Sequence, residues 1–340
     1  MIIRKLNYYR KRAGIIGIIK KVLANYGLIN FNIQEHMYDR YYSHLPEDDY
    51  SKELIECYKS ITGNNINPLI NPKTFNEKIQ WIKLNDSNDL KTCCADKYNV
   101  RKYVSDKIGD DYLVPIYGCR DRFEDIDFSE LPNEMIFKST TGSSRYKIVR
   151  DKSTININEL KSLFNTWQYL PFGYFGMEIH YLDINRKIIC EKLLNMDGPS
   201  VVDYKIHCFN GKPLIVEYIS DRKNHSIRES WFDTKWNKLN IVMDSDSALN
   251  HEITPDSPEK LEKMIEISKI LSEDFIYVRV DLYEIDGKIY FGELTFTPAN
   301  GFDKWKGRKS QLLVGKLLRL PYEERLDIEE INKIMSDLKE

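Results

Sequence analysis

The residues with the clearest chemical meaning lie in two alternating runs near the C-terminus. Arg279 and Asp281 are two positions apart in the first run, and Glu293 and Thr295 are two positions apart in the second. Side chains at such spacing share one face of a β-strand. If the two faces coincide, Asp281, Glu293 and Thr295 form an oxygen-rich metal site beside the fixed cation Arg279. Mg²⁺ and a triphosphate require this combination of groups.

The register of these two runs decides whether the faces coincide. Asp286-Gly287 stands between them and is typical of a two-residue hairpin turn. A strict turn of this kind pairs Asp281 with Gly292 and sends Glu293 to the opposite face. The metal site therefore requires a longer turn or a bulge. The alternative interpretation is an exposed amphipathic hairpin whose charges are solvated.

A second candidate is a lysine beside a loop of small residues. Lys138 follows the strand-like run 135–137 and precedes a loop that contains Gly142, Ser143 and Ser144. Backbone N–H groups and hydroxyls of such a loop can surround phosphate oxygens, and the ammonium can offset their charge. The alternative for Lys138 is a solvated lysine at the end of a strand.

Three weaker patterns leave their alternatives open. Lys205 alternates with Asp203, so it could meet phosphate or form an ion pair. Asn300-Gly301, with basic residues after it, could hold a carboxylate substrate or begin a solvated basic segment; those residues are Lys304, Lys306, Arg308 and Lys309. Asp244-Ser245-Asp246 could hold a sugar nucleotide through a metal, or form a solvated loop. The histidines at 180, 207, 225 and 251 show no ligand spacing, and most of them are interpreted as structural.

The elements that must position these side chains form a mixed pattern of helices and strands. Strand-like runs occur at 113–117, 135–137, 147–149, 187–194, 201–209 and 214–219, before the final hairpin. Residues 35–90 suit a helical cap, and further helices are predicted at 97–104 and from Ser257-Pro258 to Leu271. A sheet with covering helices is therefore expected.

Composition indicates an ordinary globular protein. The 340 residues carry a formal charge of −2, with 42% hydrophobic and 30% charged residues. Six cysteines show no zinc spacing and are expected to be reduced thiols. Ala13–Ile19, the longest apolar run near the start, is too short to span a bilayer. We therefore expect a cytoplasmic protein.

Basic charge is concentrated at the N-terminus. Residues 1–34 contain seven Lys or Arg and no acid, interleaved with apolar residues. Residues 1–30 could lie on the anionic inner face of a membrane, or form a basic helix packed on the body of the protein. The confinement of basic charge to this end argues against nucleic-acid binding.

The order of the motifs resembles that of ATP-grasp enzymes over about 200 residues. Asp96-Lys97 is similar to the pair that supplies a phosphate-contacting lysine, and Lys138 with its loop is similar to the loop that covers the phosphates. The segment 190–194 is similar to the hinge that receives adenine, which implies nucleotide contacts for Glu191, Lys192 and Leu194. The resemblance also implies phosphate contacts for Lys205 and Arg279, with Arg279 and Lys138 as catalytic cations.

A closer resemblance is to the TupA-like branch of ATP-grasp proteins, named for a member implicated in teichuronopeptide synthesis. The segments that carry it are 71–81, 203–213 and 291–298. The chain departs from the branch at two places: the loop has one glycine and continues with bulky Arg145-Tyr146, and Thr295 stands where Asn is commonest.

The resemblance implies an α+β, ATP-grasp fold in which two subdomains grip ATP. The expected parts are an N-terminal helical extension (1–64), a cap (65–134), a small subdomain with the phosphate loop (135–200), a large subdomain with the metal site (201–320) and a C-terminal helix (321–340). The implied activity is a ligase that uses ATP and Mg²⁺ to join a carboxylate to an amine, here an amino acid to a uronic-acid sugar of a bacterial surface polysaccharide. A glycosyltransferase and a nucleotide-binding scaffold without turnover are the alternatives.

Overall fold

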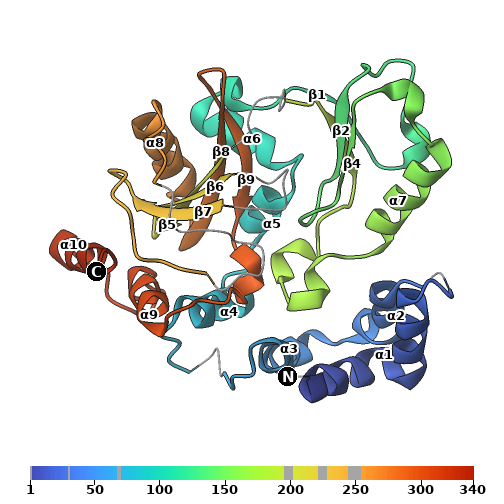
Figure 1. Ribbon diagram of the computed structural model, residues 1–340, viewed down its shortest axis with the longest axis horizontal. Coiled ribbons are helices and arrows are strands. Elements are labelled where there is room, and N and C mark those ends of the chain that lie inside the picture. The colour runs from blue at the N-terminus through green and yellow to red at the C-terminus, as the bar shows by residue number, and fades with distance from the viewer. Residues whose placement is uncertain (1, 30, 67–69, 195–201, 221–227, 244–253) are drawn as a thin grey trace.

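The computed structural model describes residues 2–29, 31–66, 70–194, 202–220, 228–243 and 254–340. Within them the chain forms two antiparallel sheets and surrounding helices (Figure 1). The strand orders are β1-β4-β2-β3 and β7-β6-β5-β8-β9. The predicted α+β architecture is confirmed.

The four-stranded sheet carries the candidate phosphate loop. Its strands and covering helix are β1 (Ile116–Arg120), β2 (Met135–Ser139), β3 (Tyr146–Val149), β4 (Ile188–Glu191) and α7 (Ile157–Tyr169). Along β2, Met135 and Phe137 alternate with more exposed residues and are fully buried. Phe137 packs on Phe164 of α7, with ring centroids 5.3 Å apart. Every second side chain of β2 is therefore buried, which anchors the strand, and the loop begins directly after Ser139 at its end.

The five-stranded sheet has one apolar and one polar face. Its strands are β5 (Asp203–Phe209), β6 (Lys212–Ser220), β7 (Arg228–Asp233), β8 (Tyr277–Ile285) and β9 (Lys288–Thr295). Ile206, Val280 and Leu294 belong to a buried cluster with Met264 and Leu271 of α8 (Leu261–Ser272). Because side chains alternate along each strand, the residues between them point to the other face of the sheet. Those residues include the candidate charged groups.

The β8–β9 hairpin contains the bulge that the predicted metal site requires. Its turn is the two-residue Asp286-Gly287, and Ile285 pairs with Lys288. The register shifts between Asp281 and Leu282, so that Asp281 pairs with Glu293 and not with Gly292. The extra residue returns Glu293 to the face of Asp281.

Glycine at position 292 allows this bulge to form. A Cβ atom there would lie 2.8 Å from the Tyr283 ring and 3.0 Å from the carbonyl oxygen of Asp281. The close approach of the two strands therefore leaves little room for a side chain.

Helices from distant parts of the chain cover the polar side of this sheet. They are α4 (Phe75–Asn85), α9 (Arg308–Leu317) and α10 (Ile328–Asp337), which share a buried cluster with Phe209 and Tyr277. Thr74 and Glu77 form a capping box that fixes the start of α4. α5 (Asp89–Ala95) and α6 (Val100–Ile108) follow α4 in sequence.

Two predicted helix starts are wrong. α8 begins at Leu261, with Ser257-Pro258 outside the helix, and α6 begins at Val100. Before α6, the Asp96 carboxylate accepts the backbone N–H groups of Tyr98 and Asn99 at 2.7 and 3.0 Å. This side-chain turn delays the helix and holds Lys97 outside it.

The N-terminal extension consists of α1 (Ile2–Asn25), α2 (Ile33–Arg40) and α3 (Tyr50–Thr62), and α1 bends at Gly14. A buried ion pair joins α1 to α3: Arg12 is 0% exposed and Glu53 is 2% exposed. Arg12 donates to both carboxylate oxygens of Glu53 and lies 3.4 Å from the ring centroid of Tyr8. Tyr41 and Tyr42 also donate to Glu53. The alternative of a basic helix packed on the body of the protein therefore describes this face of α1.

We predict that Arg12→Met destabilises the extension by about 3–5 kcal/mol, because the Glu53 carboxylate would remain buried without its cation. The free energy of unfolding from urea titration followed by circular dichroism measures this loss. Arg10→Met, at an exposed position of the same helix, is the matched control. Arg12→Met/Glu53→Leu should recover part of the loss, and equal losses in Arg12→Met and Arg10→Met would contradict the prediction.

Candidate functional site

The polar face of the five-stranded sheet brings most of the predicted hairpin residues together. Strands β5, β8 and β9 place them in two adjacent rows: Lys205, Asp281 and Glu293 in one, and His207, Arg279 and Thr295 in the other. Three strands in register therefore collect the predicted metal ligands and two predicted phosphate-binding cations on one surface.

Asp281 is the centre of this arrangement. It accepts two hydrogen bonds from Arg279, Nε to Oδ1 and Nη2 to Oδ2, both at 2.7 Å, and one from Lys205 Nζ at 3.0 Å. Burial opposes the charge of Asp281, but Arg279 and Lys205 outweigh it and lower the pKa of this carboxyl below its usual range. Asp281 in turn holds the pKa of Arg279 well above its ordinary value, against the effect of burial. Both cations are fixed in place before any ligand arrives.

Glu293 is the more accessible of the two acids. Its side chain is 37% exposed, against 7% for Asp281. Glu293 Oε1 accepts a hydrogen bond from the Thr295 hydroxyl at 3.0 Å and lies 3.9 Å from Arg279 Nη2. Glu293 Oε2 lies 3.7 Å from Lys97 Nζ. An anionic ligand at this surface would meet three cations, namely Lys97, Lys205 and Arg279, and the accessible carboxylate of Glu293.

These oxygens fit Mg²⁺ only together with oxygens of a ligand. Among the described residues, no group of three or more His, Cys, Asp or Glu side chains is placed to hold a metal ion. Mg²⁺ is commonly held by one or two carboxylates together with substrate phosphates and water. Glu293 and the Thr295 hydroxyl would be the accessible metal ligands, and Asp281 would lie beneath them as the less exposed acid.

Lys97 connects the candidate phosphate loop to this surface. Its Nζ donates to the carbonyl oxygen of Gly142 at 2.6 Å, in addition to its proximity to Glu293. Gly142 has φ +78°, and a Cβ atom there would lie 2.3 Å from the Phe172 ring. Glycine is therefore needed at this position. Ser143 and Ser144, next in the loop, are exposed.

Arg145 turns away from the loop. Its guanidinium donates to the carbonyl oxygens of Trp167 and Leu170 at 3.1 and 2.9 Å, at the C-terminal end of α7. Burial, together with nearby Arg186, lowers the pKa of Arg145 to about 10. The bulky residue that departs from the family pattern thus stabilises a helix end.

Lys138 and the predicted adenine hinge lie together on the four-stranded sheet. Lys138 Nζ is 2.5 Å from Glu191 Oε2, and Glu191 is buried. The Lys192 backbone N–H donates to the carbonyl oxygen of Pro115 at 2.9 Å, while the Lys192 side chain is exposed and Leu194 is half-buried. The Glu191 carboxylate therefore has Lys138 as its partner.

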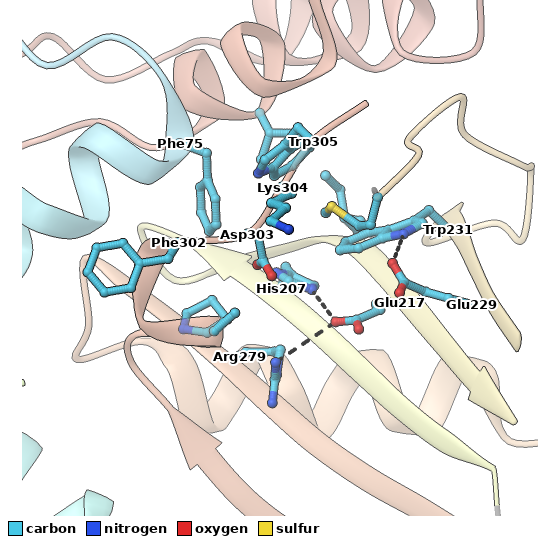
Figure 2. A pocket seen from close by; sticks show the side chains of 15 residues that line it. Phe75, His207, Glu217, Glu229, Trp231, Arg279, Phe302, Asp303, Lys304 and Trp305 are labelled. Carbon is cyan, nitrogen blue, oxygen red and sulfur yellow. Dashed lines mark hydrogen bonds and ion pairs between the residues drawn. The ribbon is translucent and has the colours of Figure 1, made fainter. Parts of the chain in front are cut away.

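The sequence analysis missed a pocket next to Arg279. This cavity of about 320 Å³ has aromatic walls, which include Phe75, Trp231, Phe302 and Trp305 (Figure 2). Three acids also line it, namely Glu217, Glu229 and Asp303. They come from β6, β7 and the segment after β9, so no local spacing in the sequence connects them.

The acids of this pocket differ in charge. Glu217 is hydrogen-bonded to His207 at 3.1 Å. Burial alone would raise the pKa of Glu217, but this hydrogen bond and the charges of Lys205 and Arg279 lower it. Burial and the neighbouring Glu217 charge raise the pKa of both Glu229 and Asp303 to about 7. Glu229 accepts a hydrogen bond from Trp231 Nε1 at 2.7 Å. The Asp303 carboxylate points into the pocket beside His207 (Figure 2). An acid with a raised pKa in a pocket is a candidate for proton transfer.

The remaining candidates have other surroundings. Asn300 accepts hydrogen bonds from Lys83 and Gln80, so it is tied to α4, and Lys304 is exposed beside the pocket. Lys306, Arg308 and Lys309 are exposed. His180 is buried, and burial with nearby Lys91 and Lys83 lowers its pKa to about 3, in agreement with a structural role. Asp244-Ser245-Asp246, His225 and His251 lie outside the described residues.

Comparison with solved structures finds a ligase and a synthetase at low similarity. D-alanine--D-alanine ligase from Bacillus anthracis, complexed with ATP, is 21% identical with a TM-score of 0.38, over 62% of this chain and 57% of that one. N5-carboxyaminoimidazole ribonucleotide synthetase from Thermus thermophilus is 11% identical with a TM-score of 0.34, over 65% and 47%. The chain thus spans about half the length of these proteins. A search of curated proteins finds no match.

A family model gives the assignment. The model described as TupA-like ATPgrasp matches residues 77–319, which is more than two thirds of the chain. The match includes Lys97, Lys138, the hinge and the complete β8–β9 hairpin. The chain belongs to the TupA-like ATP-grasp family.

Proposed function

We propose that the chain is an ADP-forming ligase that activates a carboxylate with ATP and joins it to an amine. The observation that carries this proposal is the polar face of the five-stranded sheet, where Asp281 fixes Arg279 and Lys205 beside the open carboxylate of Glu293. Family membership supports ATP as the nucleotide. Fixed cations next to an acid that is open to metal are suited to phosphoryl transfer, in which alignment and charge neutralisation supply most of the catalysis.

The first step would transfer the γ-phosphoryl group. A carboxylate oxygen of the donor forms a bond to the γ-phosphorus, the bond from that phosphorus to the β,γ-bridging oxygen breaks, and ADP leaves with the electron pair. Arg279, Lys97 and Lys138 would neutralise the charge on the transferred group. Mg²⁺, when bound, would supply further charge neutralisation at the phosphates.

The second step would use the pocket beside Arg279. The amine nitrogen attacks the acyl carbon, a C–N bond forms, and phosphate leaves with the electrons of the C–O bond. The amine must lose a proton, and Asp303 is a suitable acceptor because its pKa is near 7. The aromatic walls of the pocket would limit the access of water to the acyl phosphate.

The substrates we propose are an amino acid and a uronic-acid sugar of a bacterial surface polysaccharide. This assignment extends the resemblance to the namesake of the TupA-like branch. The pocket is compatible with it, since an ammonium group suits a site with aromatic walls and carboxylates such as Glu217.

We predict that Glu293→Gln weakens Mg²⁺-dependent ATP binding by at least about tenfold, because it removes the open metal-binding carboxylate. Isothermal calorimetry with and without Mg²⁺ measures the effect. Asp286→Asn, an exposed acid-to-amide change in the turn of the same hairpin, should bind ATP as the wild type does. Equal Mg²⁺-dependent affinity in Glu293→Gln and the wild type would remove Glu293 from the site, and no ATP binding by the wild type would overturn the proposed function.

We predict that Asp303→Asn slows amide formation by roughly 10²- to 10⁴-fold, because the proton acceptor is lost. Phosphoryl transfer should persist, since Asp303 acts after it. The assay screens uronic acids with amino acids for ADP release, and hydroxylamine then replaces the amino acid to trap the acyl phosphate. A variant that forms the amide at the wild-type rate would exclude Asp303 as the base.

Asp303 also has an expected effect on stability. Its pKa is about 7 in the folded protein and 3.8 in the reference state, so the folded state binds the proton more tightly. The contribution of Asp303 to stability is therefore lost as the pH rises from about 4 through 7. We predict that the Tm of Asp303→Asn, relative to the wild type, rises between pH 5 and pH 8. A difference in Tm that is independent of pH would contradict this.

A further inference from the structure

The outer face of α1 after its bend at Gly14 is unusually apolar. Five of its side chains are exposed: Ile15 by 64%, Ile16 by 68%, Ile19 by 53%, Val22 by 48% and Tyr26, just beyond the helix, by 77%. Residues 15, 19, 22 and 26 are three or four positions apart, so they form one stripe along the helix. Of the 18 large hydrophobic residues that are exposed in the described part of the chain, eight lie between residues 6 and 29.

This stripe is not needed to pack α1 on the rest of the protein. The inner face of α1 uses small residues, and Ala13 and Gly17 allow α2 to approach closely. His36 of α2 is hydrogen-bonded to the carbonyl oxygen of Ala13 at 3.0 Å, and a Cβ atom at position 17 would lie 2.6 Å from the His36 ring. The apolar stripe thus remains outside after the helix has been packed.

The charge around the stripe is positive. Lys20 is exposed and Lys21 half-buried within the same helical turns, and no acid occurs before Glu35. Lys11 and Arg12 are already neutralised by Glu56 and Glu53 on α3. Within the described part of the chain, Lys20 and Lys21 instead lie over aromatic rings. A second copy of this face would therefore bring like charges together, but an anionic lipid surface would complement them.

We propose that this face of α1 binds the anionic surface of a membrane. The apolar stripe would enter the boundary between headgroups and acyl chains, and Lys20 and Lys21 would lie among anionic headgroups. No helix in the described part of the chain is long and apolar enough to cross a bilayer, so the contact would be peripheral. The three N-terminal helices lie together along the lower edge of the molecule in Figure 1, and the side chains of the stripe are exposed there. The inference is independent of the proposed ligase activity.

The test is flotation of the full chain with vesicles of phosphatidylcholine alone or with 25% phosphatidylglycerol. The wild type should float with the anionic vesicles and dissociate as the salt concentration rises. Ile16→Ser/Ile19→Ser should lower the partition coefficient by more than about tenfold, and Lys20→Ala by about fivefold. Ile328→Ser and Lys333→Ala, which change an exposed isoleucine and an exposed lysine of α10, are the matched controls.

Three results would overturn the proposal. They are no flotation of the wild type, equal flotation with neutral vesicles, and equal losses in the α10 controls. Sedimentation is measured in parallel: a wild-type dimer that Ile16→Ser/Ile19→Ser converts to a monomer, without vesicle binding, would assign the face to a second copy instead. Circular dichroism verifies that each variant is folded.

Discussion

The site depends on one buried carboxylate. Asp281 accepts hydrogen bonds from Arg279 and Lys205, which belong to adjacent strands, and its side chain is only 7% exposed. A buried charge is stable only when it is paired and hydrogen-bonded. Because Asp281 must keep both partners, β5 and β8 have to pair in one register. The two cations are therefore already ordered when an anionic ligand arrives, which lowers the entropic cost of binding it.

The same charges determine the protonation of the adjoining pocket. Arg279 and Lys205 help to keep Glu217 ionised, and the charge of Glu217 then adds to burial in raising the pKa of Asp303 and Glu229. Two acids near their titration points next to fixed cations are typical of a site that moves protons. The polar face of the five-stranded sheet and the adjoining pocket are thus electrostatically coupled through Arg279.

The two sides of α1 in the N-terminal extension differ in exposure. Arg12 on its inner side is neutralised by Glu53 and covered by Tyr8, while Ile16 and Ile19 on its outer side remain exposed. The sequence analysis treated packing on the body and contact with a membrane as alternatives. The structure pairs Lys11 and Arg12 with acids of α3, so packing of a basic helix on the rest of the protein describes the inner side of α1.

The sequence alone determined the two strands of the hairpin and which side chains share a face of each strand. The alternation of side chains along a strand predicted that Arg279 shares a face with Asp281, and Glu293 with Thr295. The family resemblance, which rested partly on these residues, was confirmed. Only the tertiary structure decided whether the pairs share a surface, because register depends on contacts across strands, here the bulge at Gly292. The pocket acids Glu217, Glu229 and Asp303 were not found for the same reason: they are far apart in sequence, and their pKa values arise from burial and from charges that only the folded chain brings together.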